Sequence, residues 1–209
     1  MATPEIYRDT DGHYVVSFDD DVIRTTVADS AGEVDSWLDE IQRVHRRRLD
    51  RLVVGLDIEW RPAFVYYASP GPVAVLQICV GRRCLVFQIL HADYLPRSLF
   101  DFLADERFTF VGVGIGDDVQ KLRAGYGLEV ERWEDLRSVA ADRLGKPSLL
   151  SAGLQALVWE VMEVRMEKPH RVRVSAWDAR TLSFDQIKYA CVDAFASFEV
   201  GRRLSAGED

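Results

Sequence analysis

The sequence predicts an α/β fold in which a central mixed sheet, an antiparallel meander plus parallel strands, is flanked by helices. Three apolar segments typical of strands follow one another near the middle of the chain: Leu52–Trp60, Val73–Val80 and Cys84–Leu90. Three consecutive strands of this kind favour antiparallel pairing. Beyond them, helix-like segments alternate with a strand-like one, which is the pattern that adds parallel strands to a sheet.

Length and composition indicate a single globular domain. A chain of 209 residues suits one α/β domain, and we expect it to span residues 1–209 with its core at 14–204. Hydrophobic residues make up 48% and charged residues 29% of the chain, so it can bury a core of ordinary size. There is no basic and apolar leader and no apolar span of about 18 residues. Neither secretion nor membrane insertion is therefore expected.

The cysteines and the net charge narrow the cellular context. Cys79, Cys84 and Cys191 are odd in number and follow no metal-ligand spacing. They indicate reduced core thiols of an intracellular protein, in the nucleus or the cytoplasm. The net charge of −8 argues against general electrostatic binding of nucleic acid. That argument weakens if acids are gathered in a metal site, because bound divalent cations would bring the protein close to neutral.

A hairpin and a helix are predicted before the meander. Residues Tyr14–Phe18 and Val22–Val27 alternate apolar and polar side chains around an acidic turn, as two paired strands do. Ser30 and Glu33 have the spacing of a capping box. The helix that they open ends in a basic run, Arg43–Arg48, which favours the helix macrodipole.

A surface loop, a helix and a further strand are predicted around the meander. Arg61–Pro72 contains three prolines and several aromatic residues, which is typical of a loop. Leu95–Asp105 is predicted to be a helix, and Phe108–Ile115 is predicted to be a strand. The sheet becomes mixed at this strand.

The glycine-rich segment Gly112–Gly116 leads into the next helix and suggests a phosphate-binding loop. Asp117 and Asp118 open that helix, and no Lys-Ser or Lys-Thr pair follows them. Because two acids at a helix N-terminus would repel phosphate, we set this interpretation aside. One aspartate is expected to cap the helix, which leaves the other to be explained.

The remainder of the chain is predicted to be mainly helical. Helices at Leu136–Leu144 and Gly153–Met162 are followed by a basic loop at Arg165–Asp178. A second capping box, Ser183–Gln186, opens a final helix. That helix is expected to run from about Asp185 to Leu204.

The strand Leu52–Trp60 carries two acids, Asp57 and Glu59, at its end. Side chains at positions i and i+2 of a strand lie on one face, with Cα atoms roughly 7 Å apart. Two like charges held this close repel unless a cation lies between them. Acids are also common where a strand ends in water. The rest of the chain decides between a cation-binding pair and a solvent-exposed strand end.

The final helix carries a second pair of polar residues, Tyr189 and Asp193. Their i, i+4 spacing places them on one face, one turn apart. Alanine, cysteine, valine and phenylalanine surround Asp193 in the sequence. An acid in so apolar a setting normally needs a partner or a metal ion.

These residues together are suited to metal-assisted hydrolysis of a phosphodiester. Two divalent cations roughly 4 Å apart need several hard oxygen ligands, and carboxylates from a strand, a strand–helix junction and a crossing helix can supply them. One cation would lower the pKa of a water and the other would stabilise the leaving 3′ oxygen. A tyrosine one turn before the last acid could orient that water.

The motifs resemble those of the DEDDy group of 3′→5′ exonucleases, which have a ribonuclease-H-like fold. Within that group the sequence is most similar to the exonuclease domain of Werner syndrome protein and to small stand-alone plant relatives. The resemblance covers nearly all of the chain from Leu52 to Leu204. The segments that carry it are Gly55–Trp60, Leu76–Cys79, Gly112–Ile115, Ser175–Trp177 and Gln186–Ala190.

The resemblance implies roles for five residues and a pair of cofactors. The acids would bind two divalent cations, Mg²⁺ or Mn²⁺, and the tyrosine would orient the attacking water; the five catalytic residues would be Asp57, Glu59, Asp118, Tyr189 and Asp193. Asp118 is preferred to Asp117 by its distance from the glycine segment and from Lys121, and Asp117 is the alternative ligand.

The substrate would be the 3′ end of a nucleic acid: single-stranded DNA or RNA, or a recessed 3′ end. Trp60 could stack on a base or simply pack, and Lys121, Arg171, Arg173 and Lys188 could contact phosphates or lie on the solvated surface. The family has an aromatic residue near the catalytic mouth where this chain has a glutamine, so the way in which the terminal base is held is open.

Partners and competing functions complete the sequence-based expectations. The chain lacks a GxxxxGK[ST] loop, so we expect no helicase segment, and a partner protein would have to supply unwinding or targeting. Homo-oligomerisation is left open. The competing functions are a catalytically silent binding module on the same fold and a nucleotide phosphoesterase. A complete set of acids and the tyrosine disfavours the first of these.

Overall fold

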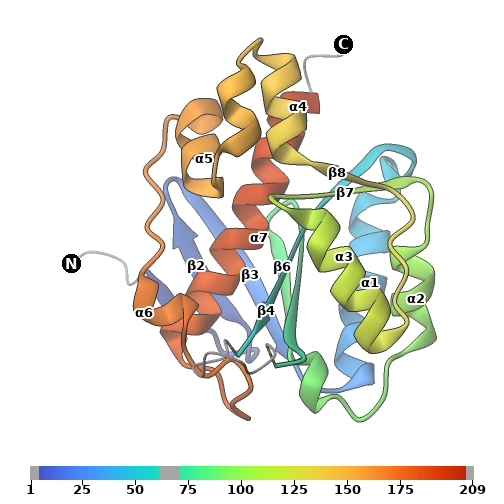
Figure 1. Ribbon diagram of the computed structural model, residues 1–209. Helices are drawn as coiled ribbons and strands as arrows, with labels where there is room; N and C mark the ends of the chain where they lie inside the picture. Colours follow the sequence, from blue (N-terminus) through green and yellow to red (C-terminus); the bar gives the residue numbers. More distant parts are fainter. Residues whose placement is uncertain (1–4, 62–70, 206–209) are drawn as a thin grey trace.

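The computed structural model describes residues 5–61 and 71–205. Within these residues the strands form one eight-stranded mixed sheet with the order β1-β2-β3-β6-β5-β4-β7-β8 (Figure 1). The strands are β1 Ile6–Arg8, β2 Tyr14–Phe18, β3 Asp21–Ala28, β4 Leu52–Trp60, β5 Val73–Val80, β6 Arg83–Phe87, β7 Phe108–Gly112 and β8 Trp133–Asp135.

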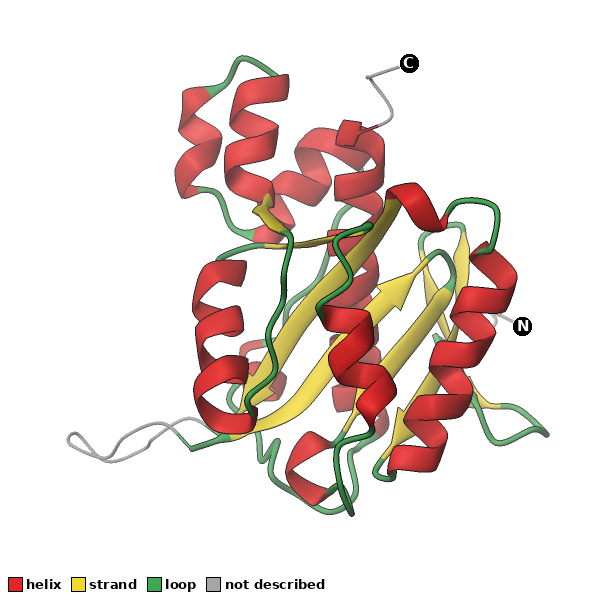
Figure 2. Ribbon diagram, turned by 90° about the vertical axis from the view of Figure 1, so that its right-hand side faces the viewer, coloured by secondary structure: helices red, strands yellow, loops and turns green. Residues whose placement is uncertain are grey.

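Helices cover both faces of this sheet. The α-helices are α1 Ala31–His45, α2 Arg97–Leu103, α3 Ile115–Tyr126, α4 Leu136–Arg143, α5 Leu154–Met162, α6 His170–Arg173 and α7 Phe184–Ser205. Short 3-10 helices lie at Leu49–Arg51, Ile89–His91 and Pro147–Ser151. Figure 2, viewed from the side on which α1, α2 and α3 lie, shows helices crossing the twisted sheet.

The alternation of side chains along the strands divides the core into two layers. On β5, Val75 and Cys79 face α4–α7, whereas Leu76 and Ile78 face α1–α3. Both layers are made of fully buried aliphatic and aromatic side chains, and this explains why the whole of β5 is apolar. A strand that is buried on both faces shows a continuous apolar run rather than alternation.

The predicted mixed sheet is confirmed. Strands β4, β5 and β6 form the antiparallel meander, and β2 and β3 form the expected hairpin. The parallel pairs are β3 with β6, β4 with β7 and β7 with β8. Because β3 pairs with β6, the hairpin extends the same sheet.

Several predicted boundaries were wrong. β6 ends at Phe87 and a 3-10 helix follows it, whereas the strand was expected to reach Leu90. β7 ends at Gly112, and the expected strand end at Ile115 is the first residue of α3. Glycine at 114 has a φ of 73°, a left-handed conformation that turns the chain from strand to helix within two residues.

Three short elements were missed. β1 and β8 have three residues each and lie at the two edges of the sheet, and α6 is a four-residue helix inside the predicted loop at 165–178. Segments this short carry little periodicity in the sequence. Most of the predicted loop at 61–72 lies outside the described residues.

The two predicted capping boxes differ in the structure. The second is confirmed: the Ser183 backbone N–H donates to Gln186 Oε1 at 2.9 Å, and the Gln186 N–H donates to Ser183 Oγ at 3.2 Å. At α1, Ser30 instead donates its hydroxyl to the Glu33 carboxylate at 2.8 Å. The backbone N–H of Ala31, at the N-terminus of α1, donates to Asp93 Oδ1 at 2.9 Å. Asp93 lies 62 residues away in the sequence.

The longest helix, α7, crosses the sheet in direct backbone contact with β4. A Cβ atom built on Gly55 would lie 2.0 Å from the Ala194 carbonyl oxygen and 2.7 Å from the Phe198 nitrogen. No side chain fits in this space. Glycine at position 55 therefore sets how closely α7 approaches β4.

Replacing Gly55 with alanine should push α7 away from β4. Because the obstacle is backbone rather than a movable side chain, we expect a loss of at least about 3 kcal/mol, or roughly 6–12 °C in melting temperature. Differential scanning calorimetry measures this change. Gly32→Ala is the matched control, because no described atom outside its own helix lies within 4 Å of the new Cβ. Equal melting temperatures for the two variants would contradict the close contact.

Candidate metal centre

Asp57 and Glu59 lie on β4 and project toward α7. The alternating residues Leu56 and Ile58 are buried in the opposite layer, against α1–α3, so the strand pleat turns both acids to the α7 side. The Ile58 N–H donates to Asp57 Oδ1 at 2.9 Å. The register between β4 and β5 shifts between Glu59 and Trp60, at the end of this acidic stretch.

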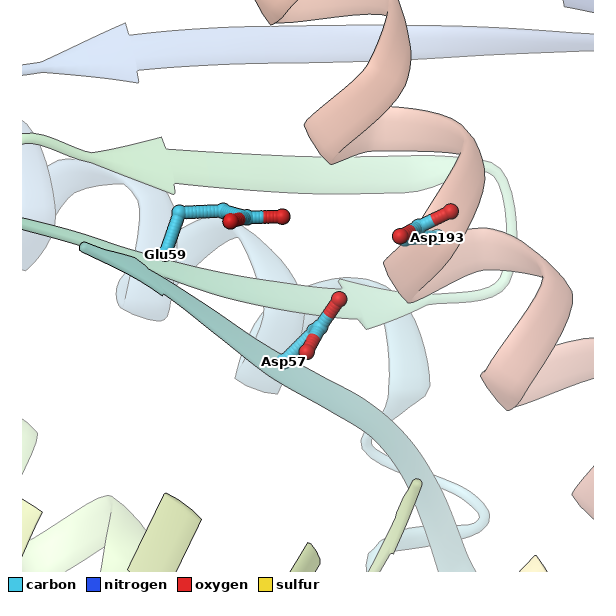
Figure 3. A group of neighbouring side chains, drawn as sticks. All are labelled: Asp57, Glu59 and Asp193. Atoms are coloured by element: carbon cyan, nitrogen blue, oxygen red, sulfur yellow. The ribbon is translucent and has the colours of Figure 1, made fainter. Parts of the chain in front are cut away.

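Asp193 reaches the same place from α7. Within the described residues, Asp57, Glu59 and Asp193 form a group whose carboxylate oxygens lie within 4.8 Å of one another. Figure 3 shows the three side chains pointing into a common space between the strand and the helix. The structure therefore brings together three of the four acids predicted from the sequence.

Burial raises the pKa of each of these acids, and the charges of neighbouring acids add to this effect for Glu59 and Asp193. For Asp57 the main cause is burial, opposed by the charge of Lys168. Burial also raises the pKa of Asp193 to about 7, again opposed by Lys168. For Glu59, burial acts together with the charges of Asp57 and Asp193 and raises the pKa to about 10. The cluster consequently holds protons near neutral pH unless cations compensate its charge.

Asp118 lies in the first turns of α3 and is only 8% exposed, whereas Asp117 is exposed. Burial raises the pKa of Asp118 to about 8, with a further contribution from the negative charge of Asp57. The expectation that one of the two aspartates caps the helix was wrong. The N-cap is Gly114, and neither aspartate side chain accepts a capping hydrogen bond at that position.

Tyr189 lies one turn before Asp193 and is largely buried. Its ring packs against Trp177, with ring centroids 5.8 Å apart. Burial and the charges of Asp193, Glu59 and Asp57 all raise the pKa of its hydroxyl, with Lys168 opposing them. The phenol therefore remains protonated at neutral pH beside the acidic group.

Lys168 is the residue at this centre that the sequence did not single out. It lies in the segment between α5 and α6, and its Nζ is 2.5 Å from Asp193 Oδ2. The same ammonium lies 5.2 Å from the centroid of the Tyr189 ring. The sequence offered no signal for this contact, because Lys168 was one of several basic residues in a predicted loop.

The predicted substrate contacts do not form one group. Trp60 and Lys121 contact each other, with the Lys121 ammonium 4.1 Å from a ring centroid of Trp60. Arg173 is exposed on α6. Lys188 forms an ion pair with Glu5, so its charge is directed toward the N-terminal strand and not toward the carboxylates.

Gln77 is a buried polar residue beside the acids. It lies opposite Asp57 in the β4–β5 register and is fully buried. Among the described residues, neither its amide nitrogen nor its amide oxygen has a hydrogen-bond partner. A buried amide without partners is destabilising, which makes it an unusual residue to find in a core.

The donor set fits a divalent cation of the Mg²⁺ or Mn²⁺ type. The group consists of carboxylate oxygens, the hard ligands that these cations prefer. Their mutual repulsion, seen in the raised pKa values, is what a bound cation would remove. The three cysteines are buried and are not part of this group.

The chain belongs to the 3′–5′ exonuclease family. The model of that family, described as a 3′–5′ exonuclease, matches residues 26–206. This match includes strands β4 to β8 and the acidic centre. Proteins named for this activity are hydrolases of phosphodiester bonds.

Two relatives indicate where the chain lies within the family. It is 35% identical to a 3′–5′ exonuclease from Arabidopsis thaliana over 87% of this chain and 63% of the relative. It is 32% identical to the bifunctional 3′–5′ exonuclease/ATP-dependent helicase WRN from Mus musculus, over 77% of this chain and 11% of that protein. The chain thus spans less than two thirds of either relative.

Solved structures support the fold. RNase D from Escherichia coli superimposes with a TM-score of 0.72 at 20% identity, over 87% of this chain and 44% of that chain. The EXD2 exonuclease domain soaked in Mn superimposes with a TM-score of 0.52 at 28% identity, over 88% of this chain and 89% of that domain. The ribonuclease-H-like prediction is confirmed.

Neutralising Asp118 should stabilise the metal-free protein. Its pKa is about 8 in the folded protein and about 3.9 in an unfolded chain, so folded wild-type protein loses stability as the pH rises between these values. Asp118→Asn removes that loss, and we expect a gain of about 1–3 kcal/mol at pH 8, or roughly 3–10 °C. Melting curves in a chelator at pH 5 and pH 8 measure the growing difference.

Asp117→Asn is the matched control for this prediction. Asp117 is exposed on the same helical turn, so its neutralisation should leave the melting temperature within about 1–2 °C at both pH values. A gain in Asp117→Asn that is absent in Asp118→Asn would reverse the assignment of the two acids.

Replacing Gln77 with methionine should also stabilise the metal-free protein. Methionine keeps the length of the side chain and removes the unsatisfied amide, so a gain of about 1–2 kcal/mol is expected in chemical denaturation. The control is Gln88→Met, because the buried amide of Gln88 donates to the carbonyls of Ala179 and Arg180 at 3.0 and 3.2 Å. The control should lose stability. A loss in both variants would mean that Gln77 is satisfied.

Proposed function

We propose that this chain is a metal-dependent 3′–5′ exonuclease that removes nucleotides from the 3′ end of DNA or RNA. The observation that carries the proposal is the convergence of Asp57, Glu59 and Asp193 within 4.8 Å, in a chain whose family is named for this activity. Acids from two distant elements are forced together here at the expense of stability. Such an arrangement is expected of a functional site.

The acids Asp57, Glu59, Asp118 and Asp193 would hold two divalent cations, Mg²⁺ or Mn²⁺. Bound there, the cations would supply Lewis acidity, which activates water and stabilises negative charge on the reacting phosphate. The Mn-soaked structure of the similar EXD2 domain supports this choice of metal. Three carboxylates lie on β4 and α7, so the packing of these two elements positions them before any ligand binds.

Tyr189 would orient the attacking water. Its hydroxyl stays protonated because burial and the neighbouring acids raise its pKa, so it can donate or accept a hydrogen bond without carrying charge. Packing against the buried Trp177 restricts the ring to one orientation. A fixed, neutral hydroxyl suits a positioning role better than that of a general base.

Substrate and partners form the rest of the proposal. Single-stranded DNA, single-stranded RNA or a recessed 3′ end could enter, and a partner protein would supply unwinding or targeting. Among the described residues no helix has the length and apolar character needed to span a bilayer. The buried free thiols support a reducing compartment, either nucleus or cytoplasm.

Incubating the purified protein with 5′-labelled DNA and RNA oligonucleotides, in Mg²⁺ or Mn²⁺, tests the function. We expect a ladder that shortens from the 3′ end one nucleotide at a time, and a duplex with a recessed 3′ end measures the strand requirement. Asp57→Ala/Glu59→Ala should reduce the rate by at least about 10³-fold, because two ligands are lost.

Other outcomes identify the competing functions. Binding of the oligonucleotide without shortening, by protein that is folded and loaded with metal, would identify a silent binding module. Hydrolysis of mononucleotides without a ladder would identify a phosphoesterase.

A further inference from the structure

Lys168 lies inside the acidic centre and not at its rim. Its Nζ contacts Asp193 Oδ2 at 2.5 Å, and its side chain is 23% exposed while that of Asp193 is 2% exposed. Asp193 is one of the three acids whose oxygens converge. The ammonium therefore forms an ion pair with Asp193 Oδ2, an oxygen that a divalent cation in this group would also bind.

The lysine is the principal cation that compensates these acids. Its charge is the largest influence opposing burial on the pKa of both Asp57 and Asp193. Lys121, a second cation that acts on Asp57, lies over the Trp60 ring on the α3 side and has a smaller effect on the pKa of Asp57. The ammonium of Lys168 therefore faces a group of three carboxyl groups, those of Asp57, Glu59 and Asp193.

The position of Lys168 between two hollows allows its ammonium to change partners. Residues 163–169 separate two hollows. One, of about 630 Å³, is lined by Tyr189 and Asp193, and the other, of about 560 Å³, is lined by Lys168 together with Trp159 and Arg165. Lys168 lines the second hollow while its ammonium reaches Asp193. A long, flexible side chain in this position can change partners by rotation of its own bonds.

We propose that Lys168 is an exchangeable counter-ion, which holds Asp193 while no divalent cation is bound and transfers its ammonium to a phosphate of the substrate strand when one binds. The inference rests on the proposed function. An ammonium is a point charge that binds carboxylate and phosphate oxygens alike. The exchange lowers the affinity for the divalent cation, because the cation must displace the Lys168 ammonium from Asp193. The displaced ammonium then binds a phosphate of the substrate strand.

Lys168→Met tests the exchange, because methionine removes the charge and keeps the apolar stem. Isothermal titration with Mn²⁺ alone should show an affinity about tenfold higher than that of the wild type, which is the factor that one charged hydrogen bond supplies. The melting temperature in chelator should fall, because the acids lose their counter-ion. KM for a single-stranded oligonucleotide in saturating Mn²⁺ should rise about five- to tenfold.

Lys188→Met is the matched control. Lys188 also lines the first hollow, but its ammonium is paired with Glu5. The Mn²⁺ affinity of this variant should equal that of the wild type. An equal gain in affinity in both variants would show that only the overall charge matters, and it would overturn the specific role of Lys168.

Lys168→Arg keeps the proposal testable if the methionine variant does not fold in chelator. A guanidinium holds a carboxylate through two hydrogen bonds, so Mn²⁺ affinity should equal or fall below that of the wild type. Tighter Mn²⁺ binding by the arginine variant would overturn the exchange.

The remaining outcomes separate the two proposals. Unchanged Mn²⁺ affinity in Lys168→Met, with a wild type that binds Mn²⁺ and shortens oligonucleotides, overturns the exchange and leaves the exonuclease intact. Weaker Mn²⁺ binding in Lys168→Met overturns it as well, since the lysine would then hold the acids in place for the metal. A wild type that neither binds Mn²⁺ nor shortens oligonucleotides overturns both proposals.

Discussion

The contact between α7 and β4 at Gly55 is the constraint on which the rest of the structure depends. The Ala194 carbonyl lies where a side chain at position 55 would begin. Asp193 immediately precedes Ala194 on the helix, and Asp57 follows Gly55 by two residues on the strand. This close approach of the two backbones is therefore next to the acids, and it brings the carboxylates near to one another.

That proximity explains the electrostatics of the centre. Carboxylates on two rigid elements cannot move apart, so burial and repulsion raise their pKa values instead. The same centre contains a resident ammonium, and a buried amide without described partners lies beside it. Each of these features lowers stability in isolation. Their concentration at one place in an otherwise apolar core is the physical signature of a site selected for binding rather than for folding.

Much of the fold and part of the centre could be predicted because the relevant signals are local. The i, i+2 acids of β4 and the i, i+4 pair of α7 follow from strand and helix geometry, and the Ser183–Gln186 box lies within four residues. The rest depends on contacts distant in sequence. Asp93 serves the N-terminus of α1, and Lys168 reaches Asp193 from a connecting segment. Neither contact produces a regular spacing of residues that could be recognised in a single sequence.

The place of α7 after all the other described helices and strands has a consequence for synthesis. Ribosomes extend a protein from its N-terminus, and domains fold as units as they emerge. In the sequence, strands β5 to β8 and five of the seven described α-helices lie between Asp57 and Asp193, and α7 fills the middle of one core layer. A nascent chain that has not yet released α7 consequently has neither a complete core nor a complete set of acids. Completion of the core and assembly of the centre therefore both require α7, and translation products that lack α7 lack the centre.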